Sequence, residues 1–412
     1  MKSCKAFDVI IIGAGINGAG IARDAAMRGL KVLLLDKNDV GSGTTSASTR
    51  LIHGGLRYLE HFEFGLVRES LRERETLLKI APHLVRPLPI AIPIYKHNKR
   101  GRVAIRAGMI VYDLLSAGKS LPRHRMLSRS ETLKQLPGLN PQGLLGSAFY
   151  FDAQIEFPER LVLENVLVAR EHDAEVFTYT PVTNLVVEGD LVSGVEFVSD
   201  DGQSHFARAD IVINAAGPWV DRLLERAPLE SPRLIGGTKG SHLVVPAFPG
   251  APTNAIYLEA QSDRRPFFII PWNGNFLIGT TDVRFEDDPD EVRCELWEID
   301  YLLAETNRAF PSAQLTRDQI LFTYSGVRPL PFSGDKDEQS ITRRHFIREH
   351  PAAKNLLSIV GGKLTTYRSL AEECVDLIFR KLGRRSPPCT TAETVLPGYT
   401  RMETDFIRNL SV

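Results

Sequence analysis

The feature that most constrains the fold of this chain lies near its N-terminus. A short run rich in β-branched residues, 8–12, leads into Gly13-Ala-Gly-Ile-Asn-Gly18, and a helix is expected over residues 16–28. A second strand is expected at residues 31–36. A strand, a glycine-rich turn, a helix and a second strand form a βαβ unit, which requires a parallel sheet covered by helices. The sequence therefore predicts an α/β fold that starts with a Rossmann-like domain.

The three glycines of this turn are spaced for binding a dinucleotide. Gly13 permits the tight turn, Gly15 lets a pyrophosphate approach the backbone, and Gly18 lets the helix pack closely on the strand. The first N–H groups of the helix are then available to phosphate oxygens. Asp36 ends the second strand, where a carboxylate can accept hydrogen bonds from a ribose. A dinucleotide site is favoured over a coincidental glycine-rich turn.

The segment after the second strand bears on which dinucleotide is bound. Gly41-Ser-Gly-Thr-Thr-Ser-Ala-Ser-Thr49 consists almost wholly of small and hydroxylic residues. Such a segment could wrap a long cofactor, or it could be a flexible surface loop. Two adjacent glycines, Gly54 and Gly55, follow it and again permit close approach of the backbone. This arrangement fits a buried flavin better than a nicotinamide, which must enter and leave.

Later segments indicate that the first domain is discontinuous. Strands are expected at 209–217 and 356–362, each followed by a helix, and residues 231–283 show the alternation of sheet residues. We predict a second, antiparallel-sheet domain for the substrate, inserted into the cofactor domain. The expected cofactor domain comprises 1–85, 150–230 and 315–385, and the expected substrate domain comprises 86–149 and 231–314.

Composition and charge exclude several classes of protein. The chain has 50 basic and 50 acidic residues, so no overall field favours nucleic acid as a partner. No apolar run approaches the ~20 residues of a membrane-spanning helix. No spacing typical of a metal site or a disulfide framework occurs, so we expect no metal and a reducing, cytoplasmic location. The residues on which this rests are Cys4, Cys294, Cys374, Cys389, His345, Glu349 and His350.

Two charged segments stand out against this neutral background. Residues 95–129 hold nine Lys or Arg against one acid, Asp113, and enclose an apolar helix expected at 103–115. This helix could dock on an anionic membrane surface, or it could be a core helix between solvated basic loops. The acidic run at 287–291 lacks the spacing of a calcium loop, so we expect a solvated loop there.

Further along the chain the sequence resembles a known family, the FAD-dependent glycerol-3-phosphate dehydrogenases, within the D-amino-acid-oxidase-like flavoproteins. Members usually continue in a helical C-terminal domain, so residues 386–412 are expected to be a remnant of it. The resemblance runs in order along nearly the whole chain. It rests on the N-terminal unit and on Thr45-Ser-Ala-Ser-Thr-Arg-Leu-Ile-His-Gly-Gly-Leu-Arg-Tyr-Leu-Glu60, Lys239-Gly-Ser-His242, Ile278-Gly-Thr-Thr-Asp282, Tyr324-Ser-Gly-Val-Arg-Pro329 and Gly361-Gly-Lys-Leu-Thr-Thr-Tyr367.

The resemblance implies two sets of functional residues. The FAD would contact Gly13, Gly15, Gly18, Asp36, Thr45, Ser46, Ser48, His53, Ala216, Gly217, Trp219, Asp282, Gly326, Gly362 and Leu364. The substrate, sn-glycerol 3-phosphate, would contact Arg57, Tyr58, His242, Arg328, Arg343, Lys363 and Thr365. The chemistry of a phosphate dianion agrees with the second set, because arginine offers it two parallel charged N–H donors.

Oxidation of a secondary alcohol also requires a base for the hydroxyl proton, and a neutral histidine suits this role. His53 and His242 both lie in the matched segments, and we favour His242 because it belongs to the inserted domain. His53, beside two glycines, could instead pack against the flavin. Arg328 and Lys363 would stabilise the alkoxide as it forms.

The predicted activity is therefore oxidation of glycerol 3-phosphate to dihydroxyacetone phosphate, with electrons passed to a membrane quinone. The basic segment would then hold the protein on the inner face of the cell membrane. A homodimer is a further expectation. Three alternatives stay open at this point: an oxidase that uses oxygen, an enzyme for another small substrate such as a 2-hydroxy acid or an amine, and a flavin-binding protein without this activity.

Overall fold

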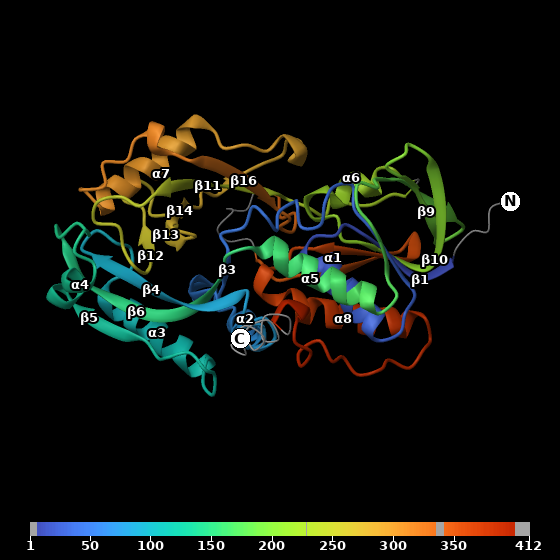
Figure 1. Ribbon diagram of the computed structural model, residues 1–412, viewed down its shortest axis with the longest axis horizontal. Helices are drawn as coiled ribbons and strands as arrows, with labels where there is room; N and C mark the ends of the chain where they lie inside the picture. Colours follow the sequence, from blue (N-terminus) through green and yellow to red (C-terminus); the bar gives the residue numbers. More distant parts are fainter. Residues whose placement is uncertain (1–5, 228, 335–341, 400–412) are drawn as a thin grey trace, which may run out of the picture.

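The computed structural model describes residues 6–227, 229–334 and 342–399. Within these residues the strands form one sheet of eight strands and one of ten, called here the first and the second sheet. Figure 1 shows the second sheet on the left and the first sheet on the right, with helices packed around both. The predicted α/β class, a Rossmann-like unit joined to a sheet-based unit, is confirmed.

The first sheet is parallel at its centre. Ile12 lies beside Leu35 on one neighbouring strand and beside Asn214 on the other, so the carboxyl ends of these strands meet at one edge. Ligands of such sheets bind at this edge. The central order is β7 (Glu175–Phe177), β2 (Val32–Leu35), β1 (Ala6–Ile12), β10 (Ser204–Asn214) and β18 (Ala353–Val360), with β17 (Phe346–His350), β8 (Val182–Glu188) and β9 (Leu191–Val198) added antiparallel.

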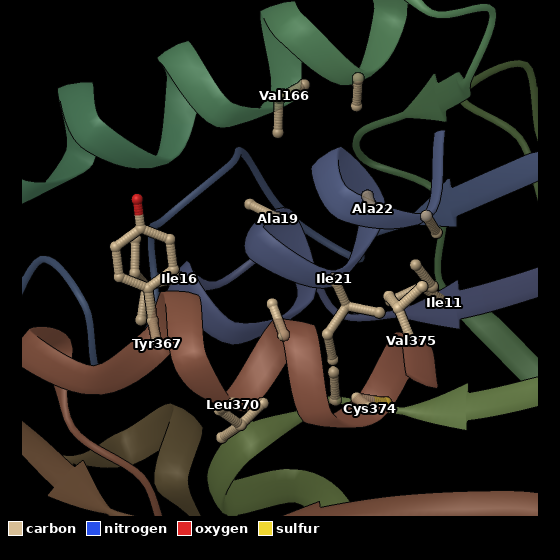
Figure 2. Packing of buried hydrophobic residues seen from close by; sticks show 14 of the residues in the cluster. Ile11, Ile16, Ala19, Ile21, Ala22, Val166, Tyr367, Leu370, Cys374 and Val375 are labelled. Atoms are coloured by element: carbon tan, nitrogen blue, oxygen red, sulfur yellow. The ribbon is translucent and has the colours of Figure 1, made fainter. Parts of the chain in front are cut away.

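Helices α1 (Ile16–Met27), α5 (Pro158–Glu171) and α8 (Tyr367–Lys381) cover one face of the first sheet. Figure 2 shows Ile11 of the sheet, Ala19 of α1 and Val375 of α8 within this core. The next residue of the strand, Ile10, packs on the opposite face with Leu185. This alternation is expected for a strand that is buried on both faces. Helix α6 (Val220–Leu224) lies on that opposite face.

The second sheet is mixed and mostly antiparallel. Its order is β15 (Val283–Arg284), β11 (Thr238–Pro246), β14 (Asn275–Gly279), β13 (Pro266–Trp272), β12 (Ala255–Glu259), β4 (Val85–Tyr95), β6 (Leu144–Ile155) and β3 (Leu51–Ile52), with β16 (Phe322–Arg328) beside β11 and β5 (Arg125–Ser128) beside β6. Helix α7 (Leu296–Ala309) packs on one face, and α2 (Phe64–Ile80) and α3 (Arg102–Leu115) pack on the other. The short helix α4 (Arg129–Gln135) follows β5.

Three strands belong to a different sheet from the one that the sequence boundaries assigned. The cofactor domain was expected to include β3, residues 150–155 of β6 and residues 322–328 of β16, yet all three strands pair within the second sheet. Strand β6 pairs with β4 from Val85 beside Ile155 to Tyr95 beside Leu144, and β16 pairs with β11 over its whole length. Such long-range pairing leaves no local trace in the sequence.

Helix α3 forms as predicted, but the interpretation as a core helix is wrong. Only Met109 and Tyr112 of the helix are buried, while Val103 is 84% exposed and Leu114 69% exposed. Among the described residues, no helix has the length and apolar character needed to span a membrane.

The predicted C-terminal remnant is only partly described. Residues 386–396 contain no regular helix, and Leu396 is buried with its N–H donating to the carbonyl of Ile80. Residues 400–412 lie outside the described part of the chain.

Candidate active site

The glycine-rich turn between β1 and α1 is tightly constrained. Gly13 has a φ of +104°, and a Cβ there would lie 2.6 Å from the carbonyl oxygen of Ala215. A Cβ on Gly18 would lie 1.9 Å from the carbonyl oxygen of Gly13. At Gly15 the only neighbour is the Thr45 hydroxyl at 3.6 Å, so the backbone there stays open to a ligand. Each glycine therefore has the structural property that dinucleotide binding requires of it.

A cleft opens at the carboxyl edge of the first sheet. Its walls come from the glycine-rich turn, the end of β2, the hydroxylic segment 41–49 and the turn after β18. Most predicted cofactor residues line it, namely Gly13, Gly15, Asp36, Thr45, Ser48, Ala216, Gly217, Trp219, Gly362 and Leu364. Gly18, Ser46, His53, Asp282 and Gly326 are outside the lining.

The hydroxylic segment 41–49 packs against β16, so the interpretation as a flexible surface loop is wrong. The Thr44 hydroxyl donates to the carbonyl of Val327 at 2.6 Å, and the Tyr324 hydroxyl donates to the carbonyl of Ser48 at 3.1 Å. A Cβ on Gly326 would lie 2.6 Å from the side chain of Ala47, so glycine is needed for this close approach. Ser46 donates to the carbonyls of residues 42 and 43, which stiffens the segment from within.

The polar groups of the cleft fit a dinucleotide. Helix α1 begins there without a side-chain cap in its first turn, apart from the Thr45 hydroxyl, which accepts the N–H of Ile16 at 3.2 Å. Within the described residues, Asn17 Oδ1 and Trp219 Nε1 are buried without a hydrogen-bond partner, and both residues line the cleft. Buried polar atoms normally have partners, so these two point to a bound ligand.

Beyond the cleft, one carboxylate gathers two of the predicted substrate arginines. Arg328, at the end of β16, donates to Asp282 at 2.9 Å, and Arg343 lies 3.5 Å from the same carboxylate. Burial would raise the pKa of the Asp282 carboxyl, but the two arginines outweigh it and hold the pKa below its ordinary value. Asp282 is thus charged, and it fixes the two guanidinium groups side by side.

Lys363 and Tyr58 complete the cationic side of the site. The ammonium of Lys363 lies 3.9 Å from the centre of the Tyr58 ring and donates to Ser70 at 3.0 Å. Burial and the charge of Arg343 lower the pKa of Lys363 to about 7. The turn η1 (Leu56–His61) carries both Tyr58 and Arg57, and the positive charge of Arg57 acts on Tyr58 and on Asp282.

His53 lies beside this cluster on a braced loop. Its backbone N–H donates to the Thr365 hydroxyl at 3.1 Å, so the buried Thr365 holds the loop. The next N–H, that of Gly54, donates to the Tyr112 hydroxyl at 3.0 Å, and Tyr112 in turn donates to Asp152 at 2.8 Å. His53 is half-buried, and burial lowers its pKa to about 4. The Asp152 carboxylate opposes this shift, and the charge of Lys363 adds to it. The imidazole is therefore neutral at pH 7.

His242 is placed differently from His53. Its ring stacks on Tyr324 with centroids 4.7 Å apart, its Nε2 bonds the Thr49 hydroxyl at 3.0 Å, and only 2% of the residue is exposed. Burial, Arg328 and Arg50 lower its pKa to about 3. Its Nε2 holds segment 41–49 against the second sheet and its Nδ1 is buried without a hydrogen-bond partner, whereas the His53 ring is only half-buried. The geometry therefore favours His53 over His242 as the group that reaches a substrate.

Sequence reasoning missed several residues of the cleft. Asn17, Lys37, Arg222 and Asp290 line it, although none was assigned to the cofactor. Asn17 occupies a variable position of the glycine-rich turn and Lys37 directly follows Asp36, so position offered a signal for these two. Arg222 and Asp290 come from distant segments that only the fold brings to the cleft.

The comparisons with known proteins identify the class to which this fold and site belong. Residues 8–368 match the family model described as "DAO: FAD dependent oxidoreductase". This span covers most of the chain, so the chain belongs to the DAO family of FAD-dependent oxidoreductases.

Within that family the chain groups with the glycerol-3-phosphate dehydrogenases. The glycerol-3-phosphate dehydrogenase of Synechocystis sp. is 52% identical, over 95% of this chain and 73% of the relative. The aerobic glycerol-3-phosphate dehydrogenase of Escherichia coli is 42% identical, over 95% of this chain and 77% of the relative. The crystal structure of the Bacillus halodurans enzyme complexed with FAD matches with a TM-score of 0.79 at 32% identity, covering 98% of this chain and 72% of that one. The predicted family is confirmed.

Proposed function

We propose that the protein oxidises sn-glycerol 3-phosphate to dihydroxyacetone phosphate with FAD as its cofactor. The observation that carries this proposal is a cationic cluster, in which Arg328, Arg343 and Arg57 act on the Asp282 carboxylate and Lys363 lies near Arg343. Asp282 offsets only one of the three arginine charges that act on it, and the positive charge that remains suits the doubly charged phosphate of the substrate. The cluster holds more positive charges than the single carboxylate of a 2-hydroxy acid, or an amine, would need.

The remaining chemistry divides between cofactor and protein. Bound FAD would supply the hydride acceptor, held by the glycine-rich turn, Asp36 and segment 41–49. We assign the base to His53, because it is neutral at pH 7 and half-buried beside Lys363 and Arg343. Its imidazole would take the hydroxyl proton of the substrate, and the neighbouring cations would stabilise the developing alkoxide.

Anaerobic addition of glycerol 3-phosphate to the purified protein tests the whole proposal. The visible flavin band should bleach, and it should bleach far faster than with glycerol at the same concentration. A yellow protein whose band does not respond to glycerol 3-phosphate would instead be a flavin-binding protein without this activity. A protein that stays colourless in excess FAD would overturn the cofactor assignment itself.

The phosphate role of Arg328 has its own test. In Arg328→Ala, kcat/KM for glycerol 3-phosphate should fall by about 100-fold or more, because a charge-assisted contact to the phosphate is lost. Turnover of glycerol, which has no phosphate, should hardly change. Arg86→Ala, a change at an exposed arginine of β4, is the matched control and should behave as the parent. Equal losses for both substrates would contradict a phosphate contact.

The exposed face of α3 supports an anionic membrane surface as a partner, and a membrane quinone as electron acceptor. Val103, Ile110 and Leu114 are exposed on this helix, which contacts η1, and the aromatic pair Phe62 and Phe64 near η1 is exposed as well. Basic residues surround them in segment 95–129. Apolar side chains framed by lysine and arginine are typical of interfacial helices.

Co-sedimentation with lipid vesicles tests this partner. Vesicles that contain phosphatidylserine should pull down the protein more than neutral ones, and Val103→Ser together with Leu114→Ser should reduce binding at unchanged activity in detergent. Equal binding to neutral vesicles would contradict the role of the basic residues in membrane binding.

Oxygen uptake without added quinone would point to the oxidase alternative. Size-exclusion chromatography with light scattering tests the homodimer, which stays a prediction.

A further inference from the structure

The acidic run predicted to be a solvated loop reaches the cofactor cleft. It forms the tip of the connection between β15 and α7 and includes the short turn η3 (Pro289–Glu291). Within the tip, the Asp288 carboxylate accepts the N–H of Asp290 at 2.9 Å. Asp290 is one of the residues that line the cleft. The loop is solvated as predicted, since Asp287, Asp290 and Glu291 are exposed, and one of its carboxylates also reaches the cleft.

Both ends of this connection are attached to the second sheet. At its start, the N–H of Phe285 donates to the carbonyl of Gly237 at 3.1 Å, just before β11. At its end, the ammonium of Lys239 donates to the carbonyl of Arg293 at 3.0 Å and pairs with Glu298 at 2.7 Å. Residues 285–293 therefore leave the second sheet and return to it, and we call them the strap.

The tip of the strap is attached to the first sheet by two ion pairs. The Lys37 ammonium lies 2.6 Å and 2.7 Å from the two carboxylate oxygens of Asp290. The Arg222 guanidinium of α6 lies 2.6 Å from Asp288. Lys37 also lies 4.1 Å from the ring centre of Trp219, which itself lines the cleft. The strap thus joins the two sheets across one end of the cleft.

This end of the cleft is the one that carries Asp36. Lys37 follows Asp36 directly, and both line the cleft together with Trp219. In dinucleotide-binding turns the acidic residue at this position accepts the ribose hydroxyls of the adenosine half. The ion pairs of the strap therefore lie beside the point where the adenosine half would bind.

We propose that Lys37 and Asp290, seconded by Arg222 and Asp288, are cofactor-retaining residues, and that FAD leaves this protein only when the strap lifts. The inference rests on FAD as the cofactor and assigns no role to the strap in substrate chemistry. All four side chains are partly exposed, so each pair is weak by itself and sensitive to salt. The strap should therefore set the rate of FAD release more than the affinity of the site.

The test measures FAD release from the holoenzyme without substrate, as flavin recovered in the filtrate over time after dilution. Asp290→Asn should release FAD about two- to fivefold faster than the parent, and Asp288→Asn with Asp290→Asn about tenfold faster, as expected for losing one or two exposed pairs. Asp287→Asn is the matched control, since it removes the same charge from the same loop at an exposed residue that is not among the paired ones. Thermal melting verifies that each variant is folded.

Two further measurements decide whether the ion pair between Lys37 and Asp290 itself slows FAD release. Lys37→Met combined with Asp290→Asn should release FAD no faster than the faster single variant, because both changes break the same contact. Salt at about 1 M should speed release from the parent and leave the Asp288→Asn, Asp290→Asn protein almost unchanged. Release rates in Asp290→Asn equal to those in Asp287→Asn, or strictly additive effects in the double variant, would overturn the proposal. Absence of any FAD would overturn the cofactor assignment instead, so the two failures are distinguishable.

Discussion

The cofactor cleft and the cationic cluster are built on opposite principles. The glycine-rich turn of the cleft lies within a short stretch of sequence, and it depends on backbone groups and on the absence of side chains, as at Gly13 and Gly18. The cluster depends on long charged side chains from distant segments, gathered around Asp282. The cleft should therefore fail when a single atom is added. The cluster should lose its function in steps, as individual charges are removed.

The largest effect is expected at the glycine-rich turn. In Gly18→Ala the new methyl group would lie 1.9 Å from the carbonyl oxygen of Gly13, so strand and helix must separate. FAD affinity should fall by about 100-fold or more, and activity should be lost with it. Titration of the apoprotein with FAD, followed by tryptophan fluorescence, measures this. Gly108→Ala in α3, where a Cβ has no neighbour within 4 Å, should bind FAD normally. Normal binding in Gly18→Ala would contradict the account of the turn.

A comparison of the two histidines is expected to give the next largest effect. His53→Gln should lower kcat by about 100- to 10,000-fold at unchanged FAD content, because the proton acceptor is lost. His242→Gln should lower kcat far less, since its enclosed ring holds segment 41–49. The absorbance of bound flavin, measured alongside steady-state kinetics, separates loss of chemistry from loss of cofactor. A larger loss of kcat in His242→Gln than in His53→Gln would indicate that His242 is the base.

The smallest effect concerns the charge of Lys363. Its pKa of about 7 means that the ammonium loses its proton as the pH rises from 7 to 9, whereas the substrate phosphate stays doubly charged there. The KM for glycerol 3-phosphate should therefore rise by about three- to tenfold across this window, since one charged contact is lost. In Lys363→Met, KM should be higher at pH 7 and nearly constant up to pH 9. A parent KM that does not change with pH would refute this role.

The first sheet and its cleft could be predicted from sequence because their determinants are local. Residues 8–36 specify a strand, a turn and a helix through glycine spacing and apolar periodicity alone, and the structure has these elements within a few residues of the expected bounds. The family resemblance then supplied Ala216, Gly217 and Gly362, which line the same cleft. Local pattern and resemblance together were sufficient there.

The rest could not be read from the sequence, because it depends on pairing between distant segments. The membership of β6 and β16 in the second sheet follows from their pairing with β4 and β11. The ion pair of Asp290 with Lys37 joins residues 253 positions apart. The choice between His53 and His242 required knowledge of which ring the protein encloses. Charge and residue type alone carried none of this information.

Helix α3 has a consequence for the active site that follows from its two faces. Its outer face presents Val103 and Leu114 to the surroundings, while its inner residue Tyr112 accepts the backbone N–H of Gly54, next to His53. A shift of this helix away from the body would leave that N–H with only Asp152, at 3.3 Å. The position of α3 and the orientation of the His53 imidazole are thus linked through this hydrogen bond. A partner that binds the outer face of α3 would therefore also affect the loop that carries His53.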